Sequence, residues 1–134
     1  MIAARRISVL SRNAKVLLEA AGYNVVIVTE LCLQQRFLAH LIAFSGNADV
    51  RYIRFKIAIK PVVSLADVEA FCALEIREFR RQNIRHPKKT HLHGEIWVAT
   101  TGGRIKSYEI LSDMIREIFP ATNVPVAFME GPSA

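Results

Sequence analysis

The sequence lacks the features that mark several classes of protein. It has six glycines and five prolines among 134 residues, too few for a collagen-like repeat or a low-complexity disordered chain. Its two cysteines, Cys32 and Cys72, form neither a disulfide framework nor a CxxC motif, and we interpret them as reduced, buried thiols of a cytoplasmic protein. No apolar run approaches the ~18 residues that span a bilayer, so we expect no membrane association.

Acidic residues are also scarce. Twelve Asp and Glu face eighteen Lys and Arg, which gives a net charge of +6. Such an excess favours an anionic partner, whether nucleic acid, lipid headgroups or an acidic protein, although a basic protein can also be merely soluble. The length suits one domain, and the hydrophobic content of 51% can supply its core. We assign residues 1–120 to that domain and 121–134 to an irregular C-terminal tail.

Apolar periodicity and capping residues predict eight elements of secondary structure. In chain order they are a helix over 11–21, strands over 23–29, 37–44 and 50–60, a helix over 64–82, strands over 93–100 and 104–110, and a helix over 112–119. Ser11, Ser64 and Ser112 are the expected N-caps. The order α-β-β-β-α-β-β-α predicts an α/β domain in which helices flank a mixed central sheet.

The third predicted strand alternates strictly. Ile53 and Phe55 face one way, whereas Arg54, Lys56 and Lys60 face the other. The long helix after it has an apolar face, which we expect to be buried, formed by Leu65, Val68, Phe71, Cys72, Ile76 and Phe79. The first strand, almost purely apolar, is likewise expected to be buried.

Four segments resemble the PD-(D/E)XK nuclease superfamily, especially its Holliday-junction-resolvase-like and Mrr-like restriction endonuclease branches. They are LLEAAGY at 17–23, AHLIAF at 39–44, YIRFK at 52–56, and GEIWV at 94–98 before a glycine turn. The resemblance covers about residues 11–119. It implies a restriction-endonuclease-like three-layer fold, a DNA substrate, Mg²⁺- or Mn²⁺-dependent phosphodiester cleavage and frequent dimerisation.

The departures from this family pattern concern its metal site. In active members an Asp and a Glu or Gln bind Mg²⁺ while a Lys orients water; here His40 stands at the Asp position, Arg54 at the Glu position, and Lys56 alone is retained. Two fixed cations would repel a metal ion and attract a phosphate, which Arg can bind bidentately. We therefore expect a DNA-binding domain of nuclease descent with impaired catalysis and no cofactor. The alternative is a solvated strand face.

Two other functions stay open. With a different register, Asp49 and Glu95 would lie beside Lys56. The two carboxylates would then bind the metal ion and Lys56 would be the catalytic lysine, giving an active endonuclease dependent on Mg²⁺ or Mn²⁺. Alternatively, the domain is a non-enzymatic interaction module or homodimer, in which the apolar segment 124–129 docks on a partner. The spacing of His91, His93 and Glu95 also suits a transition metal, but we favour a polar strand entry there.

The densest basic segment lies at 77–89. Its cations are Arg77, Arg80, Arg81, Arg85, Lys88 and Lys89. The first of them lie at the end of the predicted helix, where the helix dipole favours positive charge, and the rest continue into the following loop. We expect them to contact the phosphate backbone of a nucleic acid without reading its sequence; the alternative is a solvated helix end.

Overall fold

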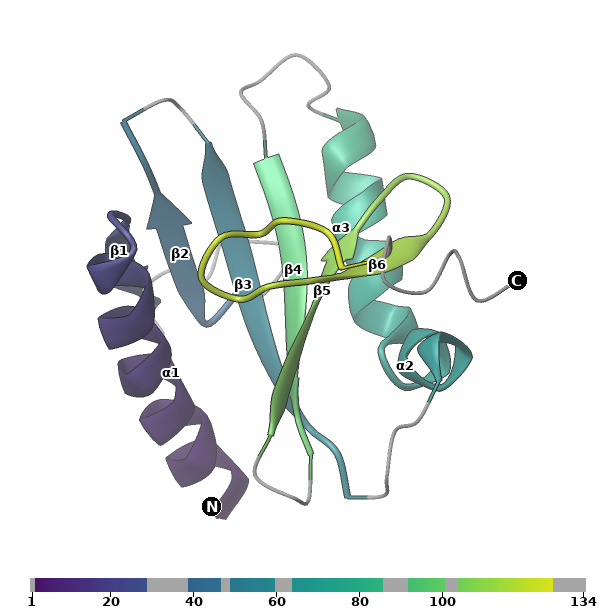
Figure 1. Cartoon of the computed structure of the whole chain (residues 1–134). Coiled ribbons are helices and arrows are strands. Elements are labelled where there is room, and N and C mark those ends of the chain that lie inside the picture. Colours follow the sequence, from purple (N-terminus) through teal and green to yellow (C-terminus); the bar gives the residue numbers. More distant parts are fainter. Residues whose placement is uncertain are drawn as a thin grey trace.

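The domain is built on one six-stranded sheet with helices on both faces (Figure 1). The computed structural model describes residues 2–28, 39–46, 49–59, 64–85, 92–100 and 104–126, with the backbone alone at 2–5, 83–85 and 92. Its elements are α1 (Ile2–Ala20), β1 (Asn24–Ile27), β2 (Leu41–Phe44), β3 (Val50–Ile57), α2 (Leu65–Phe71), α3 (Ala73–Arg85), β4 (Leu92–Ala99), β5 (Ile105–Ile110) and β6 (Ile115–Ile118).

The strands lie in the sheet in chain order. β3 and β4 run parallel, and every other neighbouring pair is antiparallel. A parallel connection must cross over the sheet, and α2 and α3 make that crossing. α1 packs on the opposite face, against β1, β2 and β3, and the segment after β6 crosses the same face (Figure 1). The predicted α/β architecture, a mixed sheet between helical layers, is confirmed.

The alternation of β3 separates two hydrophobic cores. Ile53 and Phe55 pack with Leu18 of α1 and with Trp97 of β4. The core on the other face lies beneath α2 and α3 and includes Val68, Cys72, Ile76, Phe79, Ile96 and Val98. Position 94 beneath this second core requires glycine, because a Cβ there would lie 2.5 Å from the Phe79 ring. The face of the sheet on which each β3 side chain lies was therefore predicted correctly.

Two predicted helices differ from the observed ones. The first begins at Ile2 rather than after Ser11, which is 3% exposed within α1, although Gly22 ends it with the expected positive φ of 100°. The second begins with the predicted capping box, in which the Asp67 amide donates to Ser64 Oγ and the Ser64 amide to Asp67 Oδ2. It then breaks at Cys72, so a single long helix was wrong.

The break at Cys72 changes which side chains are buried. Val68 and Cys72 lie in the core as expected, but Leu65 is 40% exposed and Phe71 is 36% exposed. A seven-residue helix presents too short a face to bury all its apolar residues, and the helical spacing does not continue across the break. The predicted burial of Leu65 and Phe71 was wrong.

The last predicted helix is a strand. Ile115 and Ile118 are both buried, Ile115 under α2 and α3 and Ile118 opposite Ser107 of β5. Their spacing of three suits one turn of a helix, but it also places them on opposite faces of a strand that is covered on both sides. Pairing with β5 decides in favour of the strand, so the helix expected over 112–119 was wrong.

The edges of the domain add two observations. β1 is the first strand of the sheet and is largely exposed rather than buried, with Val26 at 48% and Ile27 at 37%. Of the tail expected over 121–134, residues 121–126 are described and form a bridge between Ile118 and Pro125. None of the helices that the structure describes is long and apolar enough to cross a bilayer.

Candidate nucleic-acid interface

Arg54 and Lys56 lie together on the face of the sheet that α2 and α3 cover. Both side chains pair with Glu75 of α3: its Oε2 lies 3.1 Å from Lys56 Nζ and 3.7 Å from Arg54 Nε. The three side chains are 16–25% exposed, so solvent and a ligand reach them from one side. Two cations and one carboxylate leave the cluster with one net positive charge.

The junction of α2 and α3 holds Lys56 in place. Its ammonium donates to the Phe71 carbonyl at 3.2 Å, in addition to the Glu75 carboxylate. The same ammonium lies over the Phe71 ring, 4.4 Å from the centroid, within the range of a cation–π contact. The helix break after Phe71 therefore creates the surroundings of Lys56.

His40 immediately precedes β2, and its ring contacts Phe55 of β3. The Phe55 amide donates to His40 Nδ1 at 2.9 Å, and the two rings stack at a centroid distance of 5.9 Å. Burial, and secondarily the charge of Arg54, lowers the pKa of His40 from its ordinary value of 6.5 to about 4. A neutral ring that accepts at Nδ1 carries its proton on Nε2. The structure thus brings His40, Arg54 and Lys56 to one end of the sheet.

This histidine predicts a loss of stability in mild acid. Because its folded-state pKa is depressed, the stabilisation is complete above pH 6.5 and is lost as the pH falls towards 4. We expect wild type to lose up to about 3 kcal/mol more than the His40→Asn variant over that interval, since Asn keeps an acceptor but does not titrate. Urea denaturation of both proteins at pH 7, 5.5 and 4.5 measures the difference. Equal losses would contradict this role of His40.

Lys106 is a further cation on this face that the sequence did not single out. Lys56 pairs with Val98, and Val98 pairs with Lys106, so the three side chains share a face of the sheet. Two strand spacings separate the lysines by roughly 10 Å. Lys106 forms no ion pair with any residue that the structure describes. Glu75 was also missed, because only the packing of α3 on β3 brings it to Lys56.

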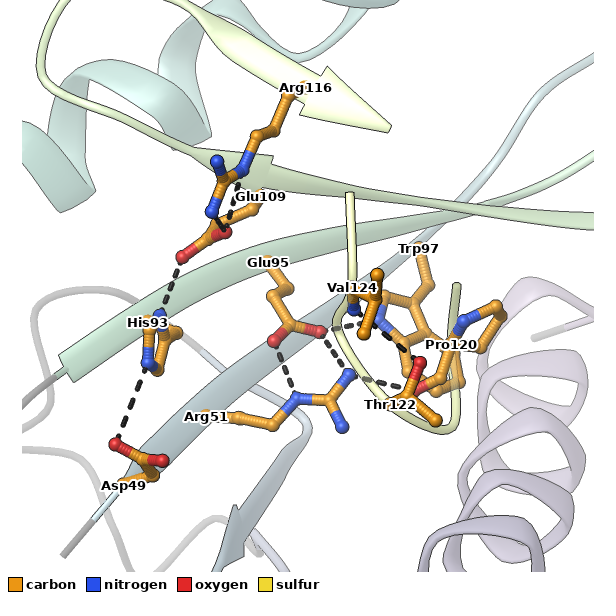
Figure 2. Close-up of polar contacts among 10 residues, drawn as sticks. All are labelled: Asp49, Arg51, His93, Glu95, Trp97, Glu109, Arg116, Pro120, Thr122 and Val124. Atoms are coloured by element: carbon orange, nitrogen blue, oxygen red, sulfur yellow. Dashed lines mark hydrogen bonds and ion pairs between the residues drawn. The ribbon is translucent and has the colours of Figure 1, made fainter. Parts of the chain in front are cut away.

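Glu95 lies on the face of the sheet opposite Lys56, because Glu95 pairs with Ile53 and not with a residue of the Lys56 face. Asp49 lies beside His93 on the same side as Glu95 (Figure 2). Glu95 forms a fully buried ion pair with Arg51: Oε2 accepts from Nε at 2.6 Å and Oε1 from Nη2 at 2.8 Å. Burial alone would lower the pKa of Arg51, but the hydrogen bonds and charge of Glu95 raise it overall. The predicted convergence of Asp49, Glu95 and Lys56 on a metal ion is therefore wrong.

The buried pair is part of a polar network that holds the segment after β6. Arg51 Nη2 also donates to the Pro120 carbonyl at 2.7 Å, and Trp97 Nε1 donates to Glu95 at 3.0 Å. This network could not be predicted from local sequence, because its members lie on different strands.

A second group of charged side chains lies beside the Arg51–Glu95 pair (Figure 2). His93 Nδ1 bonds Glu109 at 2.5 Å, Arg116 Nη2 donates to the same carboxylate at 2.8 Å, and Asp49 lies 3.9 Å from His93 Nε2. The hydrogen bond with Glu109 raises the pKa of His93 despite its burial. Burial would raise the pKa of Glu109, but His93 and Arg116 lower it. Within the described ranges, no three His, Cys, Asp or Glu side chains are grouped to hold a metal.

The cations of the basic segment 77–89 have different roles in the structure. Arg80 is structural: Nε donates to the Leu111 carbonyl at 2.8 Å and Nη2 to the Met114 carbonyl at 3.2 Å, which ties α3 to the β5–β6 turn. Arg77 and Arg81 are exposed and line a hollow on α3 together with Glu69, Ala73, Ile76 and Arg80. Arg85 ends α3, and its side chain is not described; Lys60, Lys88, Lys89 and His91 lie outside the described residues.

Comparison with known proteins establishes the fold. No protein-family model and no curated protein sequence matches the chain. Among solved structures, it is similar to Archaeoglobus fulgidus Hjc, a Holliday junction resolvase from an archaeal hyperthermophile. The TM-score is 0.53 and the identity 12%, over 94% of this chain and 96% of that one. The restriction-endonuclease-like α/β fold that the sequence predicted is thereby confirmed.

Proposed function

We propose that this protein is a DNA-binding domain of PD-(D/E)XK nuclease descent whose catalytic site has become a phosphate-binding site. The observation that carries the proposal is the Arg54–Lys56–Glu75 cluster. At the strand positions where a nuclease of this family would place a metal-binding acid and a lysine, this chain has two cations 3.7 and 3.1 Å from a single carboxylate. The resolvase-like fold supports the same proposal.

The cluster suits a phosphodiester. A guanidinium can donate two parallel hydrogen bonds to phosphate oxygens, and an ammonium adds a point charge beside it. Lys106 lies on the same face of the sheet, and Arg77 and Arg81 are exposed on α3, where Arg81 pairs with Glu78. Contacts of this kind provide affinity and orientation but no base recognition.

Binding and cleavage in one gel assay test the proposal. Labelled four-way-junction and linear duplex DNA are incubated with the protein in chelator or in Mn²⁺, at low and moderate salt. We expect retarded DNA in chelator, weaker retardation at higher salt because counterions are released on binding, and no cleavage under any condition. Cleavage in Mn²⁺ would establish an active endonuclease instead, and the absence of retardation would contradict DNA binding.

Glu75 competes with phosphate for both cations, which gives a second prediction. The Glu75→Gln variant removes the carboxylate but keeps the size of the side chain, so we expect DNA to bind about three- to tenfold more tightly. Fluorescence anisotropy in chelator measures this gain. Glu19→Gln is the control, since it makes the same change in net charge at the exposed pair with Lys15 on α1. An equal gain in the two variants would show a general charge effect and not local competition.

A homodimer is the second candidate, and the exposed edge of the sheet favours it. Among the strands that the structure describes, β1 pairs with β2 alone, and its side chains Val26 and Ile27 are exposed. An apolar strand edge can pair with another chain. Sedimentation equilibrium tests this: a dimer that Val26→Lys dissociates would support the interaction module, and a monomer throughout would contradict it.

A further inference from the structure

We propose that Phe71 is a stacking platform for an unpaired nucleobase whose phosphate is bound by Arg54 and Lys56. The proposal rests on the proposed function and names its substrate class: DNA that contains unpaired nucleotides, such as a single strand, a gap or the open centre of a branched structure. A fully paired duplex would then bind at the same cations without the contribution of Phe71.

Phe71 is unusually exposed for a residue of its helical face. Its helical spacing predicts that Phe71 belongs to the core under α2, yet the residue is 36% exposed. The helix ends directly after it, at Cys72, which is itself fully buried. Leu74, at the start of α3, is 71% exposed, so the helix junction presents apolar side chains to solvent. A single exposed aromatic residue needs no explanation in general, but the ring of Phe71 lies beside the Lys56 ammonium.

The Phe71 ring lies close to the cations of the cluster. Lys56 Nζ lies 4.4 Å from the centroid of the Phe71 ring and 3.1 Å from Glu75, which also faces Arg54. A phosphate that displaces Glu75 from these cations therefore comes next to the ring. Aromatic side chains beside a cationic groove are the general means by which proteins bind single-stranded nucleic acid, because every base has a π-face.

The chemistry of the ring decides which DNA is favoured. Phenylalanine has no polar group, so it can stack on a base but cannot read its hydrogen-bonding edge. Both faces of a base inside a duplex are covered by its neighbours, and only an unpaired or unstacked base can reach the ring. We therefore expect selectivity for the structure of the DNA and little selectivity for its sequence.

The ring and the backbone of Phe71 both contact Lys56. The Lys56 ammonium donates to the Phe71 carbonyl at 3.2 Å while it lies over the Phe71 ring. These two contacts favour one position of the ring relative to the cation. A pre-positioned ring loses little conformational freedom when a base stacks on it, which favours affinity.

A double-mutant cycle between the protein and the DNA tests the proposal. Wild type and Phe71→Ala are titrated, in chelator, with a short labelled single strand and with a strand of the same length in which every nucleotide is abasic. Phe71→Ala should weaken binding of the intact strand roughly 5- to 150-fold and should leave binding of the abasic strand unchanged. Phe71→Trp should bind at least as tightly as wild type.

Two controls keep the result specific. Phe44→Ala removes a ring of similar exposure, 37%, and should leave single-strand affinity unchanged. Phe44 lies opposite Val50, at the other end of β3 and roughly 20 Å from Lys56. Thermal melting of each variant establishes that it folds. If Phe71→Ala does not fold, Phe71→Leu replaces it, because leucine keeps most of the apolar volume but removes the π-system.

The outcomes separate this proposal from the proposed function. Equal losses for the intact and the fully abasic strand would mean that Phe71 only positions Lys56, and would overturn the platform. Unchanged binding in Phe71→Ala, with duplex and single strands bound alike, would also overturn it while the DNA-binding function stands. No binding to any DNA would overturn both.

Discussion

Replacing Glu95 with alanine is expected to lower the free energy of unfolding by about 3–5 kcal/mol. Arg51 and Glu95 are both fully buried, so the variant leaves a guanidinium in the core without its counter-ion. Trp97 Nε1 loses its hydrogen-bond acceptor as well. Urea denaturation at pH 7, with the transition followed by the fluorescence of Trp97, measures the change.

Two comparisons make this first prediction specific to the buried pair. Glu19→Ala removes an exposed carboxylate that pairs with Lys15 at 3.5 Å, and should cost less than about 1 kcal/mol. Replacing both partners, as Arg51→Met with Glu95→Leu, should recover much of the loss, because an apolar pair needs no charge compensation. A Glu95→Ala protein as stable as Glu19→Ala would contradict the buried ion pair.

Replacing Arg54 and Lys56 together with glutamine is expected to reduce DNA affinity by about 100-fold or more. Each side chain should contribute a charge-assisted hydrogen bond to phosphate, worth about 1.5–3 kcal/mol. The slope of log affinity against log salt should also become shallower by roughly 2, because two fewer counterions are released. Fluorescence anisotropy in chelator at several salt concentrations gives both quantities.

The control for this second prediction makes the same charge change elsewhere. Arg12 and Lys15 lie on α1, over the opposite face of the sheet, and Arg12→Gln with Lys15→Gln also removes two positive charges. We expect this variant to lose only the small affinity that follows from the lower net charge. Equal losses in the two double variants would show that general charge, and not the Arg54–Lys56 site, attracts DNA.

The sequence predicted those parts of the fold that local pattern determines. The alternation along β3 placed Arg54 and Lys56 on one face and Ile53 on the other, as observed. The Ser64–Asp67 capping box located the start of α2. Both follow from neighbouring residues alone.

The errors in the predicted fold occurred where distant residues decide the outcome. The segment 112–119 has spacing that fits a helix or a strand, and only its pairing with β5, including the Arg116–Glu109 ion pair, selects the strand. The break at Cys72 depends on how α2 and α3 each pack on the sheet, which the unbroken apolar spacing cannot reveal. Ser11 resembles an N-cap in sequence, yet it is a buried residue of a longer helix.

The candidate site was predicted only in part for the same reason. Arg54 and Lys56 of β3 could be identified because they lie two residues apart, on one face of the strand, and because Lys56 matches the family motif. Glu75, Phe71 and Lys106 reach the site from α3, α2 and β5, and none has a local sign of that role. Glu95 resembled a metal ligand in sequence, but the packing of β3 beside β4 pairs it with Arg51 on the far face of the sheet.

The location of bound DNA is the most direct test of the central claim. We would titrate ¹⁵N-labelled protein with a short DNA strand in chelator and follow the backbone amide signals. We predict shifts for Arg54, Lys56, Phe71 and Glu75, on the face under α2 and α3. Shifts confined to Asp49, His93, Glu109 and α1, on the other face, would contradict it.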